Sequence, residues 1–547
     1  MTRRLRPIAA PFVVARPAGA RVRTRLPVSD HDEQVLRAVG EHLGSLAGSD
    51  LARRQSEGRL DAKGRAASRR ERKRALTAGS SSRWAGAITR TSEDVWQRGY
   101  RNLQAEARSL RARIGRIGRR LQVPAAVKQG KLRGYGSQAE RFAKQQRLQV
   151  LQHRLAEVEA RLREARVSIC RGGKQLARSR HHLREAGLTQ AQWRTRWAAA
   201  RLFICADGES DKAWGNETIR WHPDQHWLEL KLPAPLAYLA NRPHGRYRLE
   251  VPVVFPYRGE EAAAQAATAA VRYDISFGTS RNRWYLDASW RLPSVTPPSL
   301  EDLRQHQTFN VDLNADHLAG WVLDRCGNPV GPPHTIPLDL DGQPASARDG
   351  RLRAAVATLI RLANANHCRS ITVENLNFTD ARQTGRETLG RGARGKRFRS
   401  TVAGIPTRAF RLLLVGMTTN AGLWVIAVDP GWTSIWGRRY WQQPLQQSTK
   451  QAITVTGHHA AAVVIGRRGL GLGARRRPGV PRPHQRMGTG ELPARPDSQT
   501  QGCEGPGPPG GQRAAAPPCK THQAERIALG NQVAHDRSVS PVSANRH

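Results

Sequence analysis

The stretch FNVDLNADHLAGWVLD, residues 309–324, decides the fold of the C-terminal half of this chain. FNVDL and HLAGWVL are apolar runs of strand length, and the polar residues between them have the composition of a tight turn, so two strands joined by a turn are predicted. Asp312 interrupts the first run, with apolar neighbours on both sides. A carboxylate at the centre of a strand is costly to desolvate unless it binds a metal ion or another partner. The stretch therefore predicts a functional site together with a strand pair.

The segments that follow alternate between helical and extended patterns. Amphipathic helices are predicted by SARDGRLRAAVATLIRLANANHC, residues 346–368, and by IPTRAFRLLLVGMTTNAG, residues 405–422. Buried strands are predicted by ITVENLNF, residues 371–378, and by LWVIAVDP, residues 423–430. Strands that alternate with helices indicate an α/β domain, which we assign to residues 301–466.

Glu374 ends the second strand of this domain in an apolar setting much like that of Asp312. The chain between the two residues has room for a hairpin and a crossover helix, so their strands are expected to lie side by side with both carboxylates at one edge. Adjacent carboxylates repel, and a divalent cation is the simplest resolution. Two Mg²⁺ ions between such groups can activate water and stabilise the leaving oxygen in phosphodiester hydrolysis. The alternative is structural, with an N-cap aspartate and a surface glutamate.

The composition of the chain points to a polyanionic partner. Its 547 residues suggest three or four domain-sized units, and 89 Lys and Arg against 44 Asp and Glu give a formal net charge of +45. Self-repulsion at this charge would destabilise a compact protein unless a polyanion neutralised it, and nucleic acid is the natural counter-charge. The alternative is a surface charged only for solubility, which rarely needs so large an excess.

Membrane and zinc-ribbon chemistry are not expected. The sequence has no run of about eighteen apolar residues, so no membrane span is predicted. Its six cysteines include no CxxC pair, which favours reduced thiols in a cytoplasmic protein. The tail from residue 467 to 547 is rich in Gly, Pro, Arg and Gln without periodicity, and we predict that it is disordered.

The first 198 residues divide into a basic N-terminal region and a helical region. Within residues 1–90, ARVRTRLPVSD predicts a short strand before a turn, and a polar, Arg- and Gly-rich stretch follows. Within residues 91–198, leucines and isoleucines recur at helical spacing from Leu103 to Leu121, and again from Leu148 to Leu162. These runs predict a coiled-coil-like hairpin whose outer face is basic.

Residues 199–300 change to a period of two. TIRWHPDQHWLELKLP predicts a hairpin that turns at Pro223 and Asp224, and GRYRLEVPVVF and RNRWYLDASWRLP predict further strands. Tryptophans, tyrosines and arginines alternate along these strands. They would stack on bases and grip phosphates, or else close the core of a small barrel, and the pattern does not separate these two interpretations.

Several ordered motifs of the C-terminal half resemble one known family. The series VDLNAD, then VENLN, then IPTRAFRLLLVGMTTNAGLWVIAVDPGWTS resembles the RuvC-like half of the TnpB family, the transposon-encoded relatives of type V CRISPR effectors, over residues 305–466. In this resemblance Asp312 matches the first catalytic acid and Glu374 the second. The regions upstream correspond in order and character to the recognition and wedge domains of the family.

The resemblance implies an α+β multidomain protein. Its parts would be a RuvC-like (RNase H-like) α/β nuclease domain, a β-barrel-like wedge domain and a helical recognition lobe. The implied function is RNA-guided DNA cleavage supported by Mg²⁺ or Mn²⁺, with Asp312 and Glu374 as metal ligands. The implied partners are a guide RNA and double-stranded target DNA, bound by one copy of the protein in a prokaryotic cytoplasm.

The sequence departs from the family at two points. The family carries a four-cysteine zinc ribbon after the TS dipeptide, whereas IWGRRYWQQPLQQSTK contains no cysteine, so no zinc is predicted. The third catalytic acid of the family begins a helix, and GHHAAAVVIGRR places His458 there, with His459 as an alternative catalytic residue. Imidazole binds divalent metals or acts as a general base, but Mg²⁺ prefers oxygen ligands. A nuclease-deficient RNA-guided DNA binder or repressor, and a decayed transposon protein with generic RNA binding, are therefore the alternatives.

Two further features have weaker functional interpretations. Asp429 is interpreted as a turn residue before Pro430, with a metal role as the alternative. The run ETLGRGARGKRFRST is Gly-interrupted and basic, and it is expected to contact a guide or target backbone, with a solvated loop as the alternative. The residues proposed for this contact are Arg391, Arg394, Lys396, Arg397 and Arg399.

Overall fold

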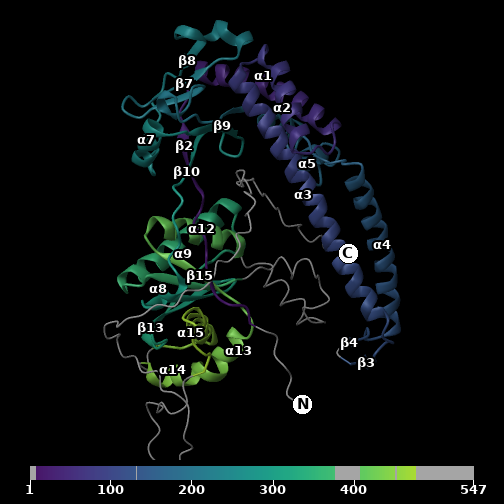
Figure 1. Cartoon of the computed structure of the whole chain (residues 1–547), viewed down its shortest axis with the longest axis vertical. Coiled ribbons are helices and arrows are strands. Elements are labelled where there is room, and N and C mark those ends of the chain that lie inside the picture. The colour runs from purple at the N-terminus through teal and green to yellow at the C-terminus, as the bar shows by residue number, and fades with distance from the viewer. Residues whose placement is uncertain (1–7, 131, 376–406, 450–452, 476–547) are drawn as a thin grey trace, which may run out of the picture. The chain divides into compact units, whose positions relative to one another are not determined.

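The computed structural model describes residues 8–130, 132–375, 407–449 and 453–475 (Figure 1). These residues form two compact units. The C-terminal unit combines the segment up to Pro17 with the residues from Ser294 onwards, and the N-terminal unit runs from Ala18 to Pro293.

A six-stranded mixed sheet forms the centre of the C-terminal unit. Its strands, in spatial order, are β1 (Phe12–Val13), β15 (Trp424–Val428), β14 (Ser370–Glu374), β11 (Thr308–Leu313), β12 (His317–Leu323) and β13 (Pro329–Pro337). The central strands β11, β14 and β15 are parallel, whereas β1, β12 and β13 each run antiparallel to their inner neighbour. The predicted strand pair within residues 309–324 is confirmed as β11 and β12.

Helices cover both faces of this sheet. Phe309 and Val311 on one face pack in a core with the apolar sides of α9 and α12, whereas Ile465 of α15 packs against Ile426 on the other face. The helices of this unit are α8 (Leu300–Arg304), α9 (Ala345–Ala365), α12 (Thr407–Asn420), α13 (Thr433–Gly437), a π-helical turn (Arg438–Gln442), α14 (Gln443–Ser448) and α15 (Gly457–Gly469). Both predicted amphipathic helices and both predicted buried strands are present, and the last helix extends past the predicted domain end at residue 466.

The sheet face that carries α15 is polar on its two central strands. Side chains alternate across a strand, so Thr308, Asn310 and Asp312 of β11 share one face. Ser370, Thr372 and Glu374 of β14 lie beside them in parallel register. Thr308 Oγ1 and Thr372 Oγ1 are 2.9 Å apart, and the buried hydroxyls are thus hydrogen-bonded across the strands. The chain therefore carries an apolar sheet face towards α9 and α12 and a polar one towards α15.

Small residues let α15 lie close to this polar face. A Cβ added to Gly466 would lie 2.3 Å from the side chain of Asn310, and one added to Gly469 would lie 2.8 Å from Thr372. Asn310 itself is completely buried, and its amide donates to the carbonyls of Thr308 and Trp321 at 2.9 and 3.0 Å. The glycines of the helix and the polar groups of the sheet together fix the position of α15.

Long helices dominate the N-terminal unit. They are α1 (Asp30–Ser56), α2 (Ala62–Thr77), α3 (Ser82–Leu121), α4 (Gln138–Arg163), α5 (Lys174–Ser179), α6 (Gln190–Arg201) and α7 (Gly259–Thr268). The predicted helical hairpin is confirmed as α3 and α4, whose leucines and isoleucines share one core with Trp96. Apolar residues recur along both helices at helical spacing, so burial of one stripe stabilises the pair.

The remaining strands of this unit form short open sheets. They comprise β2 (Gly19–Leu26), β10 (Arg283–Arg291), β9 (Arg272–Gly278) and β5 (Ile204–Ala206) in one sheet, β6 (Ile219–His222), β7 (Trp227–Lys231) and β8 (Arg246–Arg248) in a second, and β3 (Lys128–Gln129) with β4 (Leu132–Arg133) in a third. The predicted hairpin is confirmed, since β6 and β7 pair antiparallel around Pro223 and Asp224. The expected barrel is not observed: among the described residues the strands of 199–300 divide between two open sheets, one of which includes the N-terminal strand β2.

Candidate active site

Asp312 and Glu374 are neighbours on adjacent parallel strands. Val311 of β11 pairs with Val373 of β14, and each carboxylate residue comes directly after its member of this pair. Both side chains belong to the polar sheet face that α15 covers. Asp312 is only 5% exposed, and the strand therefore holds it out of bulk water. The strand register therefore places the two carboxylates side by side, as the two sequence motifs predict.

The environment of Glu374 opposes its ionisation. Burial, and then the negative charge of Asp312, raise the pKa of Glu374 to about 8. The hydroxyl of Thr433, which donates to Glu374 Oε1, and the positive charge of Arg468 act in the opposite direction without cancelling the shift. Glu374 therefore retains its proton near neutral pH, unless another cation takes the place of that proton.

Arg468 reaches this edge from the last turn of α15. Its side chain is buried, and it donates to the carbonyl of Asp429 and, at 2.9 Å, to that of Gly431. Thr433 begins α13 two residues later and also donates to the carbonyl of Pro430 at 3.0 Å. The turn after β15 is thus tied to both α15 and Glu374, which holds the carboxylate in one orientation.

His458 lies at the start of α15 and contacts the other carboxylate. Its Nδ1 donates to Asp312 Oδ2 at 2.8 Å, and half of its side chain is exposed. This hydrogen bond raises the pKa of His458, with the negative charges of Asp312 and Asp316 adding to the effect and burial opposing it. The structure thus brings three predicted site residues, Asp312, Glu374 and His458, to one edge of the sheet.

His459 has a different position although it is the next residue. It is 3% exposed, and its Nδ1 accepts from the backbone N–H of Thr456 at 3.1 Å, so the neutral ring donates from Nε2 to Thr335 Oγ1 at 2.9 Å. Burial lowers the pKa of His459 to about 4, which keeps the ring neutral. Thr456 and His459 form a reciprocal cap of α15, an arrangement worth roughly 1 kcal/mol. Both ring nitrogens of His459 therefore serve the fold.

Asp429 ends β15 beside the two carboxylates and is hydrogen-bonded by backbone groups. The N–H of Ala9 donates to its Oδ2 at 3.0 Å and that of Gly431 to its Oδ1 at 2.8 Å. This is the turn role that the sequence predicts. Its charge still reaches the site, since it adds to the raised pKa of Glu374.

The donor set suits a divalent cation in part. Mg²⁺ prefers oxygen ligands and is commonly held by one or two carboxylates while it keeps several waters, and Asp312 and Glu374 supply such a pair. A third protein ligand is not assembled: in the described part of the chain no three His, Cys, Asp or Glu side chains are grouped so that they could hold a metal ion. His458 is instead bonded to Asp312. The two carboxylates therefore fit the metal, and the histidine does not add a ligand in this arrangement.

Sequence reasoning missed several polar residues of the site. Asn314 donates to Asp312 Oδ2 at 3.3 Å, and the ring of His317 lies edge-on to that of His458 with centroids 5.2 Å apart. Thr433 and Arg468 were not singled out either, although both lie inside quoted motifs. A signal for Asn314 and His317 was available, because Asn314 begins the turn directly after the Asp312 strand and His317 begins the strand that follows this turn. The predicted contact residues Arg391 to Arg399 lie outside the described residues.

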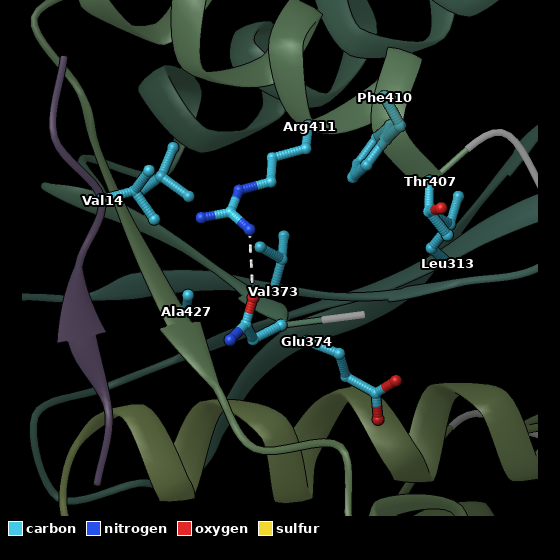
Figure 2. Close-up of a pocket in the computed structure, with 10 residues that line it drawn as sticks. Val14, Leu313, Val373, Glu374, Thr407, Phe410, Arg411 and Ala427 are labelled. Atoms are coloured by element: carbon cyan, nitrogen blue, oxygen red, sulfur yellow. Dashed lines mark hydrogen bonds between the residues drawn. The ribbon is translucent and has the colours of Figure 1, made fainter. Parts of the chain in front are cut away.

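A small cavity lies on the opposite face of the same sheet edge. It has a volume of about 20 Å³, room for about one water molecule, and Arg411 of α12 extends into it and donates to Asn375 Oδ1 at 3.1 Å (Figure 2). In Figure 2 the carboxylate of Glu374 points away from Arg411 and Phe410, towards the helix on the other sheet face. The chemistry of Glu374 is therefore directed to the α15 side.

Comparisons with known proteins leave the family of this chain open. Neither a family model nor a curated protein matches it. Among solved structures it is similar to Thermus thermophilus RuvC in complex with a Holliday junction substrate, at 17% identity over 30% of this chain and 91% of that chain with a TM-score of 0.21. It is similar to a Cas12f1–sgRNA–target DNA complex, at 9% identity over 82% of this chain and 98% of that chain with a TM-score of 0.22.

A further structure of T. thermophilus RuvC is 20% identical over 32% of this chain and 85% of that chain, with a TM-score of 0.14. TM-scores this low carry no conclusion about fold or chemistry. What supports a function is the geometry of the carboxylate edge and the charge of the chain. In addition, no helix of the described residues is long and apolar enough to cross a membrane.

Proposed function

We propose that this protein is a RuvC-like, metal-dependent endonuclease that cleaves DNA at a site selected by a guide RNA. The observation that carries the proposal is the buried pair Asp312 and Glu374, in which the pKa of Glu374 is raised to about 8. Such a pair attracts a divalent cation. The formal charge of +45 supports a nucleic-acid partner, and the family resemblance of the motifs supports RNA guidance and an origin in a transposon.

In this proposal the residues of the edge have separate roles. Asp312 and Glu374 would hold Mg²⁺ or Mn²⁺, with water completing the coordination, and the ion would supply activation of water and stabilisation of the leaving oxygen. Thr433 and Arg468 orient Glu374 and moderate its charge. His458 holds Asp312 through Nδ1 and is placed to carry a proton at the edge of the site.

A second candidate is an RNA-guided DNA binder that does not cleave. Two observations favour it: His458 occupies one oxygen of Asp312, and no third ligand is assembled among the described residues. Such a protein would repress by occupying its target. A protein with generic RNA binding is the third outcome, and it would have neither a defined guide nor a defined target.

Asp312→Asn and Asp429→Asn are the matched pair that tests the proposal, because both carboxylates lie at the ends of parallel strands. The full-length protein with its copurified RNA is incubated with duplex target in Mg²⁺ or Mn²⁺. We expect discrete RNA ends, cleavage by wild type, background cleavage by Asp312→Asn with unchanged target binding, and near wild-type cleavage by Asp429→Asn. Tight, guided binding without cleavage by wild type would select the second candidate, and a featureless RNA population the third.

A further inference from the structure

The N-terminal unit contains an open cavity of about 430 Å³ between α1, the segment 169–171 before α5, and α6. This volume falls in the range of pockets that take small molecules or single nucleotides. We call it the cationic cavity. Its wall includes Ser45, Gly48, Ser49, Arg171, Trp197 and Arg201. Nothing in the carboxylate edge uses these residues, and the cavity lies wholly inside one unit.

Glycines of α1 create the space for this cavity. A Cβ on Gly44 would lie 2.3 Å from the carbonyl oxygen of Arg201, so the end of α6 crosses α1 directly over that glycine. One turn further along, a Cβ on Gly48 would be 3.5 Å from the Arg201 guanidinium, which is ordinary contact. The first glycine is therefore needed for packing, whereas the second leaves open space beside a positive charge.

The positive charges of the cavity have no negative counterpart. Arg171 donates to the carbonyls of Arg201 and Leu202, at 3.3 and 2.7 Å, but in the described part of the chain neither arginine has a carboxylate in ion-pair range. Burial, with a contribution from the charge of Arg201, lowers the pKa of Arg171 to about 10. Two guanidinium groups held together without an acid create a demand for an anion.

A pair of stacked tryptophans, Trp193 and Trp197, lies beside these charges. Trp193 and Trp197 stack with ring centroids 5.5 Å apart, and the Arg201 guanidinium lies 5.4 Å from the Trp197 ring. α6 has no buried residue, although it carries two tryptophans. Both tryptophan rings are half-buried. Aromatic rings beside arginines bind bases and phosphates together in single-stranded nucleic-acid sites.

We propose that the cationic cavity binds one nucleotide of a single-stranded polynucleotide, with its phosphate at Arg201 and its base against Trp197. An acidic peptide would satisfy the charge but not the aromatic wall, and the excess of 89 basic over 44 acidic residues favours the polynucleotide. RNA and DNA offer the same phosphate and base chemistry. The proposal does not depend on the carboxylate edge, so it holds whether or not the protein cleaves DNA.

Equilibrium binding of fluorescent oligo(U) and oligo(dT), each about eight nucleotides long, to the full-length protein tests this site. Gly48→Leu fills the cavity without changing a charge, and Trp197→Leu removes the aromatic wall. Stacking of one base on an aromatic ring is worth about 1–3 kcal/mol, which corresponds to about fivefold to 150-fold in Kd. We expect that increase for both variants and a similar one for Arg201→Gln.

Arg194→Gln is the matched control, because it removes the same charge from an exposed position of the same helix. It should change Kd by less than about twofold. Photo-crosslinking of 4-thiouridine oligonucleotides, followed by mass spectrometry, should place the adduct at the cavity in wild type and not in Gly48→Leu. The proposal is overturned if Gly48→Leu and Trp197→Leu bind like wild type, or if Arg194→Gln weakens binding as much as Arg201→Gln. A selective effect on oligo(U) or on oligo(dT) identifies the polynucleotide.

Discussion

The carboxylate edge and the cationic cavity contain charges of opposite sign that are at least half-buried, each lacking a full complement. At the edge, burial and then the charge of Asp312 raise the pKa of Glu374, so Glu374 retains a proton or the edge takes up a cation. In the cavity, burial and Arg201 lower the pKa of Arg171, so the pair favours an anion. The difference lies in how rigidly each is held. Buried strands and a capped helix position the carboxylates, whereas the stacked tryptophans belong to a helix with no buried residue.

This contrast teaches that unbalanced charge has a different use in each place. A rigid, narrow edge suits an ion whose coordination must be fixed before chemistry occurs. An open cavity with partly exposed aromatic rings suits a ligand that enters and leaves along a chain. We therefore expect that removing charge at the edge affects stability and metal binding. Removing charge at the cavity should affect the affinity for nucleic acid and its salt dependence.

The largest expected effect is on the pH dependence of stability. A carboxyl group whose pKa rises from 4.5 in the unfolded chain to about 8 in the fold binds more protons when folded. The free energy of unfolding therefore falls as pH rises between these values, by on the order of a few kcal/mol for this group. Glu374→Gln should flatten that fall in metal-free buffer, as measured by urea unfolding from pH 5 to pH 8.5.

Added Mg²⁺ should restore the stability of wild type at pH 8 and leave Glu374→Gln unchanged. An equal gain for both proteins would show that the ion binds elsewhere. Asp429→Asn serves as the control, since its carboxylate is already bonded by two backbone N–H groups, and it should keep the wild-type response to Mg²⁺.

A third carboxylate at the edge should increase the affinity of the site for a divalent cation. His458→Asp supplies the oxygen ligand that Mg²⁺ prefers, so Mg²⁺-supported cleavage should rise by roughly tenfold and the preference for Mn²⁺ should shrink. Wild type should lose activity as pH falls, because protonated His458 stays bound to Asp312. Since the pKa of His458 is raised, this protonated form persists to a higher pH than for an ordinary histidine. Rates measured from pH 5.5 to pH 8.5 in each metal check both expectations.

His459→Ala, a change at the adjacent residue, is the control variant for that experiment. It removes the His459 ring's half of the reciprocal cap of α15 and should lower the free energy of unfolding by about 1 kcal/mol, while the folded protein keeps its metal preference. If His458→Asp cleaves no better than wild type and His459→Ala abolishes cleavage selectively, the two histidines have been assigned in the wrong order.

The smallest expected effect concerns salt. Removing one phosphate-binding cation from a single-stranded site reduces the slope of log Kd against log salt by about 0.7. Arg201→Gln should show that reduction for oligo(U), whereas Glu374→Gln should leave the slope unchanged. Titrations between about 50 and 200 mM salt resolve the two. Equal slopes for wild type and Arg201→Gln would show that Arg201 binds no phosphate.

Local sequence was sufficient to predict most elements and the two carboxylates. Period-two and helical patterns depend on neighbouring residues alone, so β11, β12, β14, β15 and the α3–α4 hairpin were predictable. The same holds for Asp312 and Glu374, because a carboxylate inside an apolar strand is anomalous without reference to any distant residue. The division of residues 199–300 between two open sheets, in place of the expected barrel, was not predictable in this way, since pairing partners such as β2 lie far away in sequence.

Only the tertiary structure separated two adjacent histidines and assembled the cationic cavity. His458 and His459 have the same local sequence, yet the helix turns one towards Asp312 and the other towards Thr335, because successive residues of a helix point about 100° apart. Arg171 and Arg201 are separated in sequence by α5 and almost all of α6, and they meet only where the end of α6 crosses α1 at Gly44. The sequence by itself determined which groups carry charge and which segments are buried in the core. The packing of distant segments decided which charges face one another.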